Sequence, residues 1–314
     1  MPKYVVSSSQ DETEQALNPD GANAKVSFNN RESSPTRKKS IINRVVITAL
    51  IVLCSVAVLL LCGWFVYSVF IKTTPEWQRD DFMIETIPGL RFGPKDPDGN
   101  ADGSLISFSP GNPESYRKWT NVMEDFVAGY MNTSKSARNA VKCDYDVPPK
   151  PGNVCVLDYT ALFPCTKENY FGFYKASPCI FIRFNKIANW TPEYYDNASQ
   201  LPPEMPAHLQ HRISEYYNIY RNLMKTVWLS CDGETAADVE NVGPIQYLPR
   251  PGFPGYFFPY NNTENYMSPV VAVHLEKPRQ SGVLINIECR LWAPNIVYNR
   301  EKGQGLVRFQ LMLN

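Results

Sequence analysis

The cysteines are the residues of this chain whose type and spacing most clearly predict chemistry. Six of the eight follow a long apolar run, and an even number is typical of disulfides made in an oxidising compartment. They lack the paired C-x-x-C spacing of a zinc site. Several pairings are open to six cysteines, and we favour the sequential one: Cys143 with Cys155, Cys165 with Cys179, and Cys231 with Cys289. We expect Cys54 and Cys62, inside the run, to be small apolar residues, with palmitoylation as the alternative.

Asn-x-Ser/Thr triplets predict a second kind of covalent chemistry, N-glycosylation. They fall at Asn132, Asn189, Asn197 and Asn261, and all of them follow the apolar run. Pro192 directly after the triplet at Asn189 disfavours glycan transfer, so that site stays open. Together the triplets and the cysteines predict that the long carboxyl-terminal part faces the outside of the cell.

Catalytic motifs are absent from the sequence. It contains no phosphate-binding G-x-x-x-x-G-K-[ST] loop, no G-x-S-x-G elbow and no H-E-x-x-H metal motif, and only 3 histidines. His208 and His211 lie three residues apart on a predicted helix, where two solvated imidazoles are favoured over a metal site. We therefore predict a noncatalytic protein without a cofactor or a catalytic metal. An ectoenzyme with an unrecognised pocket is the alternative that sequence leaves open.

One uncharged apolar run, Val45 to Ile71, precedes the six disulfide candidates and the four triplets. Its orientation in a membrane decides on which side these residues lie. At about 1.5 Å per residue the run is about 40 Å long, more than the roughly 30 Å of a bilayer core. Basic residues are denser before the run, at 31, 37–39 and 44, than after it, at 72 and 79. The positive-inside rule therefore predicts a single-pass type II membrane protein with a cytosolic amino terminus. The formal net charge of +0 gives no reason to expect nucleic-acid binding.

Composition divides the chain into four predicted parts: a disordered cytosolic tail (1–44), the transmembrane helix (45–71), an extracellular stalk (72–105) and a disulfide-bonded ectodomain (106–314). Prolines and an Asp-Pro-Asp-Gly turn predict that the stalk is irregular from Pro75 to Gly103.

The ectodomain pattern predicts two helices among several strands. Asn112 and Pro113 begin a helix whose apolar residues recur at helical spacing up to Tyr130, and a second apolar stripe runs from Leu209 to Val227. The expected strands are 154–159, 179–187, 270–275, 282–291 and 306–313. This alternation favours an antiparallel β-sandwich with interposed helices.

Several blocks of sequence, in order, resemble the beta subunit of the sodium/potassium and proton/potassium P-type pumps. The blocks are Thr74–Arg79 (TPEWQR), Ile106–Pro110 (ISFSP), Pro178–Ile187 (PCIFIRFNKI), Phe257–Tyr260 (FFPY) and Ile287–Cys289 (IEC). The resemblance covers nearly everything from Thr74 to the end of the chain.

This resemblance implies an immunoglobulin-like ectodomain with three sequential disulfides and no catalytic activity. It implies a catalytic alpha subunit as partner, which the chain helps to fold and to reach the cell surface, and whose potassium transport it tunes. The implied contacts are the membrane aromatics Trp64, Phe65, Tyr67 and Phe70, the exit residues Thr74, Pro75, Trp77, Gln78 and Arg79, and the loop Phe257, Phe258, Pro259 and Tyr260. Lipid-facing aromatic residues at the membrane interface explain the first group nearly as well. Around Phe253 to Tyr260 we expect an exposed aromatic patch.

Departures from the family pattern predict a divergent paralogue. The membrane run has no aromatic residue from Val45 to Leu53, and the aromatic motif continues as Phe257-Phe258-Pro259-Tyr260-Asn261-Asn262, where Asn261 is itself a glycosylation triplet. The alternative function is a cell-adhesion or junction glycoprotein that uses the same ectodomain for contacts between copies or between cells, independently of a pump.

Overall fold

The computed structural model describes residues 35–73, 85–97, 103–279 and 282–314, with the side chains of the first helix described from 43 to 69. The chain divides into two compact units, Met1–Phe70 and Ile71–Asn314. The predicted exit residues Thr74, Pro75, Trp77, Gln78 and Arg79 lie outside the described residues.

The first unit contains one long helix, α1, from Pro35 to Thr73. Its segment Asn43–Val69 is long and apolar enough to cross a membrane, and it is the one such helix among the residues that the structure describes. The hydroxyls of Thr48, Ser55 and Ser68 donate hydrogen bonds to carbonyls of their own helix, so these polar atoms need no water. Because α1 begins at Pro35, the prediction of a disordered tail up to residue 44 is wrong for its last part. Proline is well suited to a first helical position.

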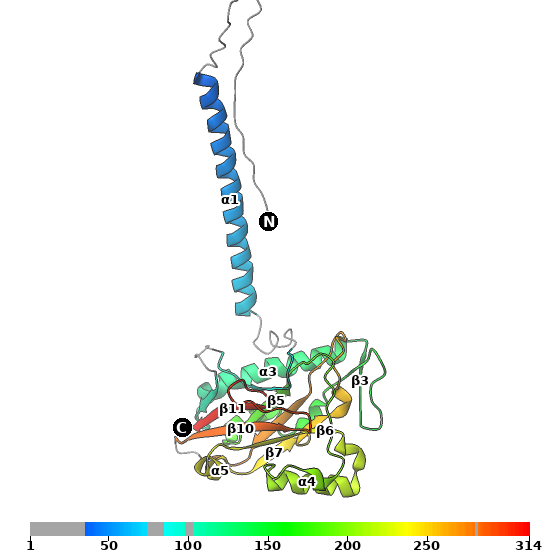
Figure 1. Ribbon diagram of the computed structural model, residues 1–314. Coiled ribbons are helices and arrows are strands. Elements are labelled where there is room, and N and C mark those ends of the chain that lie inside the picture. Colours follow the sequence, from blue (N-terminus) through cyan, green and yellow to red (C-terminus); the bar gives the residue numbers. More distant parts are fainter. Residues whose placement is uncertain (1–34, 74–84, 98–102, 280–281) are drawn as a thin grey trace, which may run out of the picture. The chain divides into compact units, whose positions relative to one another are not determined.

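Two sheets form the centre of the second unit (Figure 1). The four-stranded sheet has the order β1 (Leu90–Gly93), β5 (Cys179–Phe184), β9 (Val270–Leu275) and β7 (Ile245–Leu248). The five-stranded sheet has the order β2 (Leu105–Phe108), β11 (Leu306–Leu313), β10 (Leu284–Trp292), β6 (Thr226–Gly233) and β8 (Gly252–Pro254). A short pair joins β3 (Ala140–Val141) to β4 (Val154–Cys155). All pairs are antiparallel except β2 with β11 and β3 with β4.

The main core lies between the two sheets. The ring of Phe92 on β1 stacks on Phe309 of β11 with the ring centroids 5.2 Å apart, and Phe184 of β5 meets Phe253 of β8 edge to face at 5.5 Å. Every residue of β5 is buried, because one face of this strand packs on the other sheet and the opposite face on a helix. Burial of these large apolar side chains supplies most of the driving force for folding.

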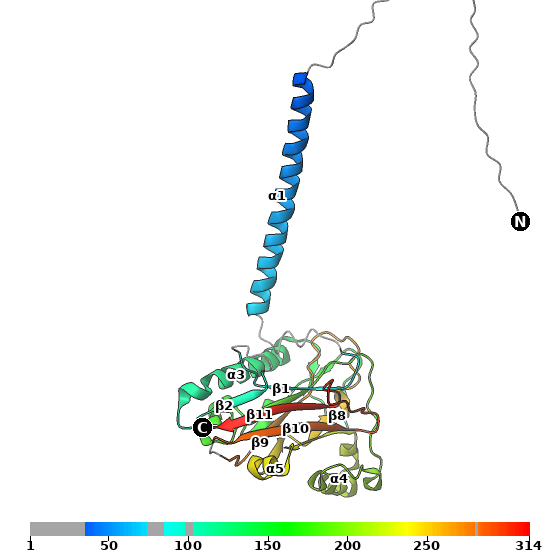
Figure 2. The ribbon, with the colours of Figure 1, turned by 60° about the vertical axis from the view of Figure 1, so that its left-hand side comes forward.

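Helices cover the outer faces of both sheets (Figures 1 and 2). The helix α3 (Pro113–Ser136) packs on the four-stranded sheet, where Phe126 meets Phe181 at 5.4 Å. The side chain of Asn112 caps its first turn by accepting a hydrogen bond from Glu114 N, as the sequence predicts. The helices α4 (Ala207–Ile219) and α5 (Ala236–Val242) lie on the five-stranded sheet. Short 3₁₀ helices are η1 (Tyr159–Leu162), η2 (Lys167–Lys175), η3 (Ala198–Gln200), η4 (Arg221–Met224) and η5 (Gly255–Phe257).

Three disulfides close loops in the second unit: Cys143–Cys155, Cys165–Cys179 and Cys231–Cys289. This is the sequential pairing favoured from the sequence. Cys231 and Cys289 are direct partners on β6 and β10, so their disulfide joins neighbouring strands of one sheet and faces the core. The mainly-β fold with one apolar helix and three disulfides is thus confirmed, whereas the closer likeness to an immunoglobulin domain stays a prediction.

Two predicted elements are wrong in part. The expected irregular stalk contains β1, whose Leu90 and Phe92 are buried, because a short strand between prolines gains its stability from pairing with the distant β5. The second predicted helix ends at Ile219, and Val227 belongs to β6. The run Val227-Trp228-Leu229 is buried on both faces of that strand, the main core on one side and α4 on the other.

Candidate partner-binding surfaces

The described aromatic side chains of α1 are exposed on the helix surface. Trp64, Phe65 and Tyr67 expose 67%, 64% and 64% of their surfaces, and the side chain of Phe70 lies outside the described residues. Trp64 and Tyr67 are three residues apart and share one face of the helix, whereas Phe65 lies on another. Exposed aromatic faces of this kind pack against a partner helix or lie in lipid at the membrane interface.

The segment that follows the exit residues is fixed to β5 by one buried amide. Asn185 accepts a hydrogen bond from Gly89 N at 2.8 Å and donates to Ile87 O at 2.9 Å and to Glu85 Oε2 at 2.8 Å. Glu85 in turn pairs with Arg91 at 2.6 Å. The sequence did not predict this anchor, because Asn185 lies about a hundred residues after Glu85 and no local pattern connects them.

Replacing Asn185 with alanine is expected to lower the free energy of unfolding by about 2 kcal/mol, because Gly89 N–H and Ile87 C=O lose their buried partner. A urea titration of the solubilised chain measures this. Asn218→Ala, at an exposed position of α4, is the matched control and is expected to change stability by less than about 0.5 kcal/mol. If both variants were equally stable, Asn185 would not stabilise this segment as proposed.

The loop at 257–260 is buried in part. Phe253 and Phe257 are buried, and Phe258 packs against Phe184 at 4.8 Å and Trp190 at 5.5 Å. The expectation of an exposed aromatic patch is therefore wrong for these residues, since their rings fill the end of the sandwich. Of the four loop residues predicted to contact a partner, Phe257 is buried, Phe258 and Tyr260 are half-buried and Pro259 is exposed.

All four asparagines of the glycosylation triplets are exposed. Asn132 lies in α3, and Asn197 precedes η3, where its Oδ1 accepts a hydrogen bond from Ser199 N. Asn189 and Asn261 are neighbours, because Ala188 pairs with Tyr260 in a parallel bridge. This neighbourhood was not visible in the sequence.

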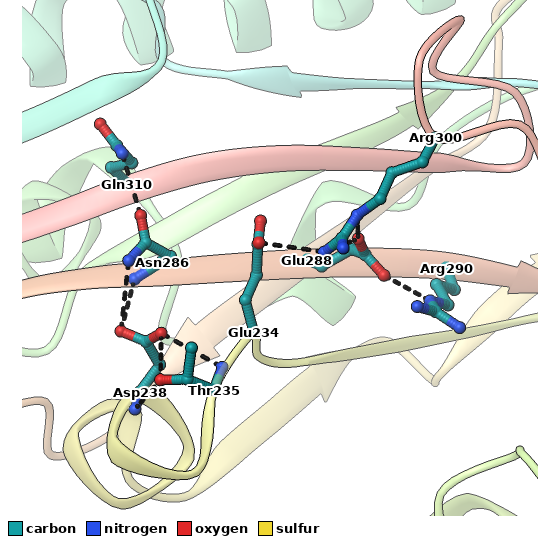
Figure 3. A network of polar contacts seen from close by, with 8 residues as sticks. All are labelled: Glu234, Thr235, Asp238, Asn286, Glu288, Arg290, Arg300 and Gln310. Atoms are coloured by element: carbon teal, nitrogen blue, oxygen red, sulfur yellow. Dashed lines mark hydrogen bonds and ion pairs between the residues drawn. The ribbon is translucent and has the colours of Figure 1, made fainter.

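A network of charged and polar side chains occupies the outer face of the five-stranded sheet (Figure 3). The buried carboxylate of Glu288 on β10 accepts hydrogen bonds from Arg290 and from Arg300 Nε, the latter at 3.0 Å. Arg300 also pairs with Glu234 at 3.0 Å. Each of these charges faces an opposite charge, and the bonds of Arg300 to Glu288 and Glu234 join its turn to the sheet.

The second half of the network caps α5. Asp238 accepts hydrogen bonds from Asn286 N at 2.9 Å and from Thr235 Oγ1 at 2.7 Å (Figure 3). The backbone bonds from Thr235 N to Asp238 Oδ2 and from Asp238 N to Thr235 Oγ1, both 3.2 Å, close a capping box. Burial alone would raise the pKa of Asp238, but these hydrogen bonds outweigh it and hold the pKa below its usual value. Asn286 also accepts from Gln310 Nε2, which extends the network to β11.

A groove and the two histidines of α4 are the other candidate sites for ligand or metal binding. The groove, of about 650 Å³ between β1 and β11, is lined by polar and apolar side chains, and its Arg91 and Arg300 are ion-paired. His208 and His211 are exposed on α4, and His211 lies 3.9 Å from Glu215. Among the described residues there is no group of three or more histidine, cysteine or acidic side chains that could hold a metal ion.

Comparison with protein-family models matches residues 38–309 to the sodium/potassium ATPase beta chain. The match starts in α1 and ends in β11, so it includes the apolar helix, both sheets and all three disulfides. The chain belongs to the sodium/potassium ATPase beta chain family.

Several curated proteins are similar to this beta chain. It is 42% identical to sodium/potassium-transporting ATPase subunit beta-2 of Drosophila melanogaster, over 82% of this chain and 80% of the relative. It is 35% identical to subunit beta-1 of the same species, over 82% and 81%. It is 26% identical to a probable subunit beta-3 of Caenorhabditis briggsae, over 78% and 73%. The prediction of a divergent beta-subunit paralogue is confirmed.

His274 is the half-buried histidine of this beta chain. Its Nε2 lies 2.9 Å from Ser177 Oγ and its Nδ1 3.2 Å from Gln246 Oε1. Burial lowers the pKa of His274, and the nearby Glu276 carboxylate opposes this only in part. The unfolded chain, in which the imidazole has its ordinary pKa of 6.5, therefore binds the proton more tightly than the folded chain.

Stability of the beta chain is expected to fall as the pH falls below 6.5, because protonation of His274 favours the unfolded state until its lowered folded pKa is passed. His274→Gln removes this contribution. The measurement is the urea midpoint at about pH 7.5 and about pH 5.5. The wild-type chain is expected to lose more stability between the two than the variant, and an equal loss would show that His274 titrates normally in the fold.

Proposed function

We propose that this chain is the noncatalytic beta subunit of a sodium/potassium-type P-type ATPase. In this role it assembles with the catalytic alpha subunit, assists its folding, accompanies it to the plasma membrane and modulates its potassium transport. The observation that carries the proposal is the extent of the family match, which covers the membrane helix and the ectodomain together. A shared ectodomain alone would fit many extracellular roles, whereas both parts together fit a subunit that meets its partner inside and outside the membrane.

The chain is proposed to have its amino terminus (1–44) in the cytosol, residues 45–71 in the membrane, and the stalk (72–105) and ectodomain (106–314) outside the cell. The dense basic residues before the apolar run support this orientation. The three disulfides and the four exposed glycosylation triplets support it too, since both modifications belong to the secretory route.

The contact with the alpha subunit is proposed to start at the helix face of Trp64 and Tyr67 and to continue through the exit residues 74–79. Close packing drives helix association in a bilayer, where water no longer favours burial of apolar groups. Large exposed rings at the end of a helix provide such packing. Of the loop 257–260, the ring of Phe257 is buried and that of Phe258 partly buried, and this loop is not included in the proposed contact.

Surface delivery of the alpha subunit tests this function. The alpha subunit is expressed in cells depleted of their own beta subunits, without and with this chain, and scored by surface biotinylation and ATP-dependent rubidium uptake. Both are expected to rise when the chain is present. If the alpha subunit stays inside while this chain reaches the surface, the beta-subunit role is wrong, and adhesion through contacts between copies becomes the favoured function.

A paired helix variant makes the test specific. Trp64→Ala with Tyr67→Ala is expected to reduce surface alpha subunit several-fold, because it removes the proposed contact face. Ile51→Ala with Val58→Ala, on the opposite face of α1, removes apolar surface without touching that face and is expected to have little effect. Equal effects of the two pairs would place the contact elsewhere.

A further inference from the structure

Two glycosylation triplets that are far apart in the sequence meet at one edge of the ectodomain. Ala188 and Tyr260 form a parallel bridge, and Asn189 N donates a hydrogen bond to Tyr260 O at 2.9 Å. The next residue after each bridged position is a triplet asparagine, Asn189 in one segment and Asn261 in the other. The two asparagines therefore share one stretch of surface.

The triplet at Asn189 is held by the fold. Trp190, its middle residue, stacks on Phe184 with the ring centroids 5.5 Å apart and meets Phe258 edge to face at 5.5 Å. The carbonyl of Thr191 accepts a hydrogen bond from Asn295 Nδ2 at 2.9 Å. With Pro192 buried immediately after it, this triplet is part of the packed end of the sandwich.

The triplet at Asn261 lies on an open turn. Asn261 and Asn262 are both exposed, and Asn262 has a φ of 54°, the left-handed conformation that asparagine adopts more readily than most residues. Beside it the rings of Tyr260 and Tyr266 pack at 4.7 Å, and Tyr266 Oη donates to Phe257 O at 3.1 Å. The turn thus combines an accessible amide with a firm aromatic base.

We propose that Asn261, and not Asn189, carries an N-linked glycan, and that this glycan covers Pro259 and Tyr260 so that the alpha subunit does not bind this edge. In the reaction, Asn261 Nδ2 forms a bond to C1 of the first sugar of a lipid-diphosphate-linked oligosaccharide. The bond from C1 to the diphosphate breaks, and the amide loses a proton. The glycan is bulky and strongly hydrated, which suits a free surface and opposes burial under a protein. The inference rests on the proposed orientation, which places the ectodomain in the secretory route.

Site occupancy tests the first part. The full chain is produced in animal cells, treated with a peptide N-glycosidase, an amidase that converts each glycosylated asparagine to aspartate, and analysed by mass spectrometry. Asn261 is expected to be converted in most molecules and Asn189 at background level. Asn261→Gln and Thr263→Ala are each expected to remove one glycan from the intact chain, whereas Thr263→Ser keeps the triplet and the glycan. An unmodified Asn261 beside occupied Asn132 or Asn197, or an occupied Asn189, would overturn the assignment.

Cross-linking tests the second part. A photoreactive amino acid is incorporated at position 260, with position 67 in the proposed helix contact as the positive comparison. In complexes purified with the alpha subunit, position 67 is expected to cross-link to it and position 260 to give only background. A cross-link from position 260 equal to that from position 67 would overturn the proposed covering of this edge.

The two experiments separate the failure of this inference from the failure of the proposed function. If the chain purifies with the alpha subunit but Asn261 is bare, only the glycan assignment is wrong. If no alpha subunit is recovered, the proposed function is wrong, while the occupancies of Asn261 and Asn189 still decide the glycan assignment.

Discussion

Replacing Cys231 and Cys289 together with alanine is expected to lower the free energy of unfolding by about 4 kcal/mol. The disulfide closes a sequence separation of 58 residues, so its loss restores much of the conformational freedom of the unfolded chain. Both cysteines are also buried between the sheets, on neighbouring strands β6 and β10, where smaller side chains leave a gap. The double variant is used because a single replacement would leave a reactive thiol.

The matched control is Cys143→Ala with Cys155→Ala. That disulfide spans only 12 residues, and the same chain-entropy argument gives about 3 kcal/mol. Urea titration of the solubilised full chain under non-reducing conditions measures both losses from tryptophan fluorescence. The variant at Cys231 and Cys289 is expected to be the less stable of the two and to be held back inside the cell. The opposite order would show that loop length does not set the contribution of these disulfides.

Truncation of Phe184 to alanine is expected to cost about 4 kcal/mol. This ring is fully buried at the end of β5, where it stacks on Trp190 at 5.5 Å and meets Phe253 at 5.5 Å and Phe258 at 4.8 Å. Its loss leaves a cavity that three other aromatic rings line, and they cannot collapse into it without moving the chain at 188–190 and 258–260.

The comparison for Phe184 is Phe163→Ala. The side chain of Phe163 is 68% exposed, so its removal is expected to change stability by less than about 0.5 kcal/mol. Urea titration measures both variants, and the emission of Trp190 should shift to the red in Phe184→Ala as water reaches the ring. A loss below about 1 kcal/mol would mean that the cluster is not a rigid part of the core.

The local sequence pattern was sufficient to predict elements whose own apolar spacing shows which side is buried. The apolar residues of α3 recur at helical spacing behind an asparagine cap, and the structure buries this stripe from Tyr116 to Tyr130. The strands β9 and β11 begin and end where their apolar runs do, at Val270–Leu275 and Leu306–Leu313. The apolar run of α1 and the even number of cysteines likewise needed no knowledge of distant contacts.

The local sequence pattern gave wrong predictions where pairing with a distant segment determines the structure. β1 is a short strand among prolines, and only its pairing with β5 and the stacking of Phe92 on Phe309 make it regular. The stripe at 209–227 has helical spacing throughout, yet Val227 pairs with Phe253 of β8 and joins the sheet. The ring of Phe258 was expected outside because the sequence does not show that it packs against Phe184 in the core.

The candidate surfaces were foreseen less completely than the fold. The membrane aromatics and the four triplets are visible in the sequence, and the structure leaves Trp64, Tyr67 and the triplet asparagines exposed. The anchor at Asn185 and the meeting of Asn189 with Asn261 depend on long-range pairing. The anchor fixes the chain shortly after the predicted exit residues, and the two asparagines lie beside the predicted contact loop, where the sequence departs from the family motif.

The central claim is that this chain is a beta subunit of a P-type pump, and purification of the tagged chain from native membranes in mild detergent tests it most directly. The measured quantity is the molar ratio of catalytic P-type ATPase subunit to chain in the purified sample. A ratio near one is expected, unchanged by further washing. A chain that is abundant at the cell surface and purifies without any catalytic subunit would contradict the claim.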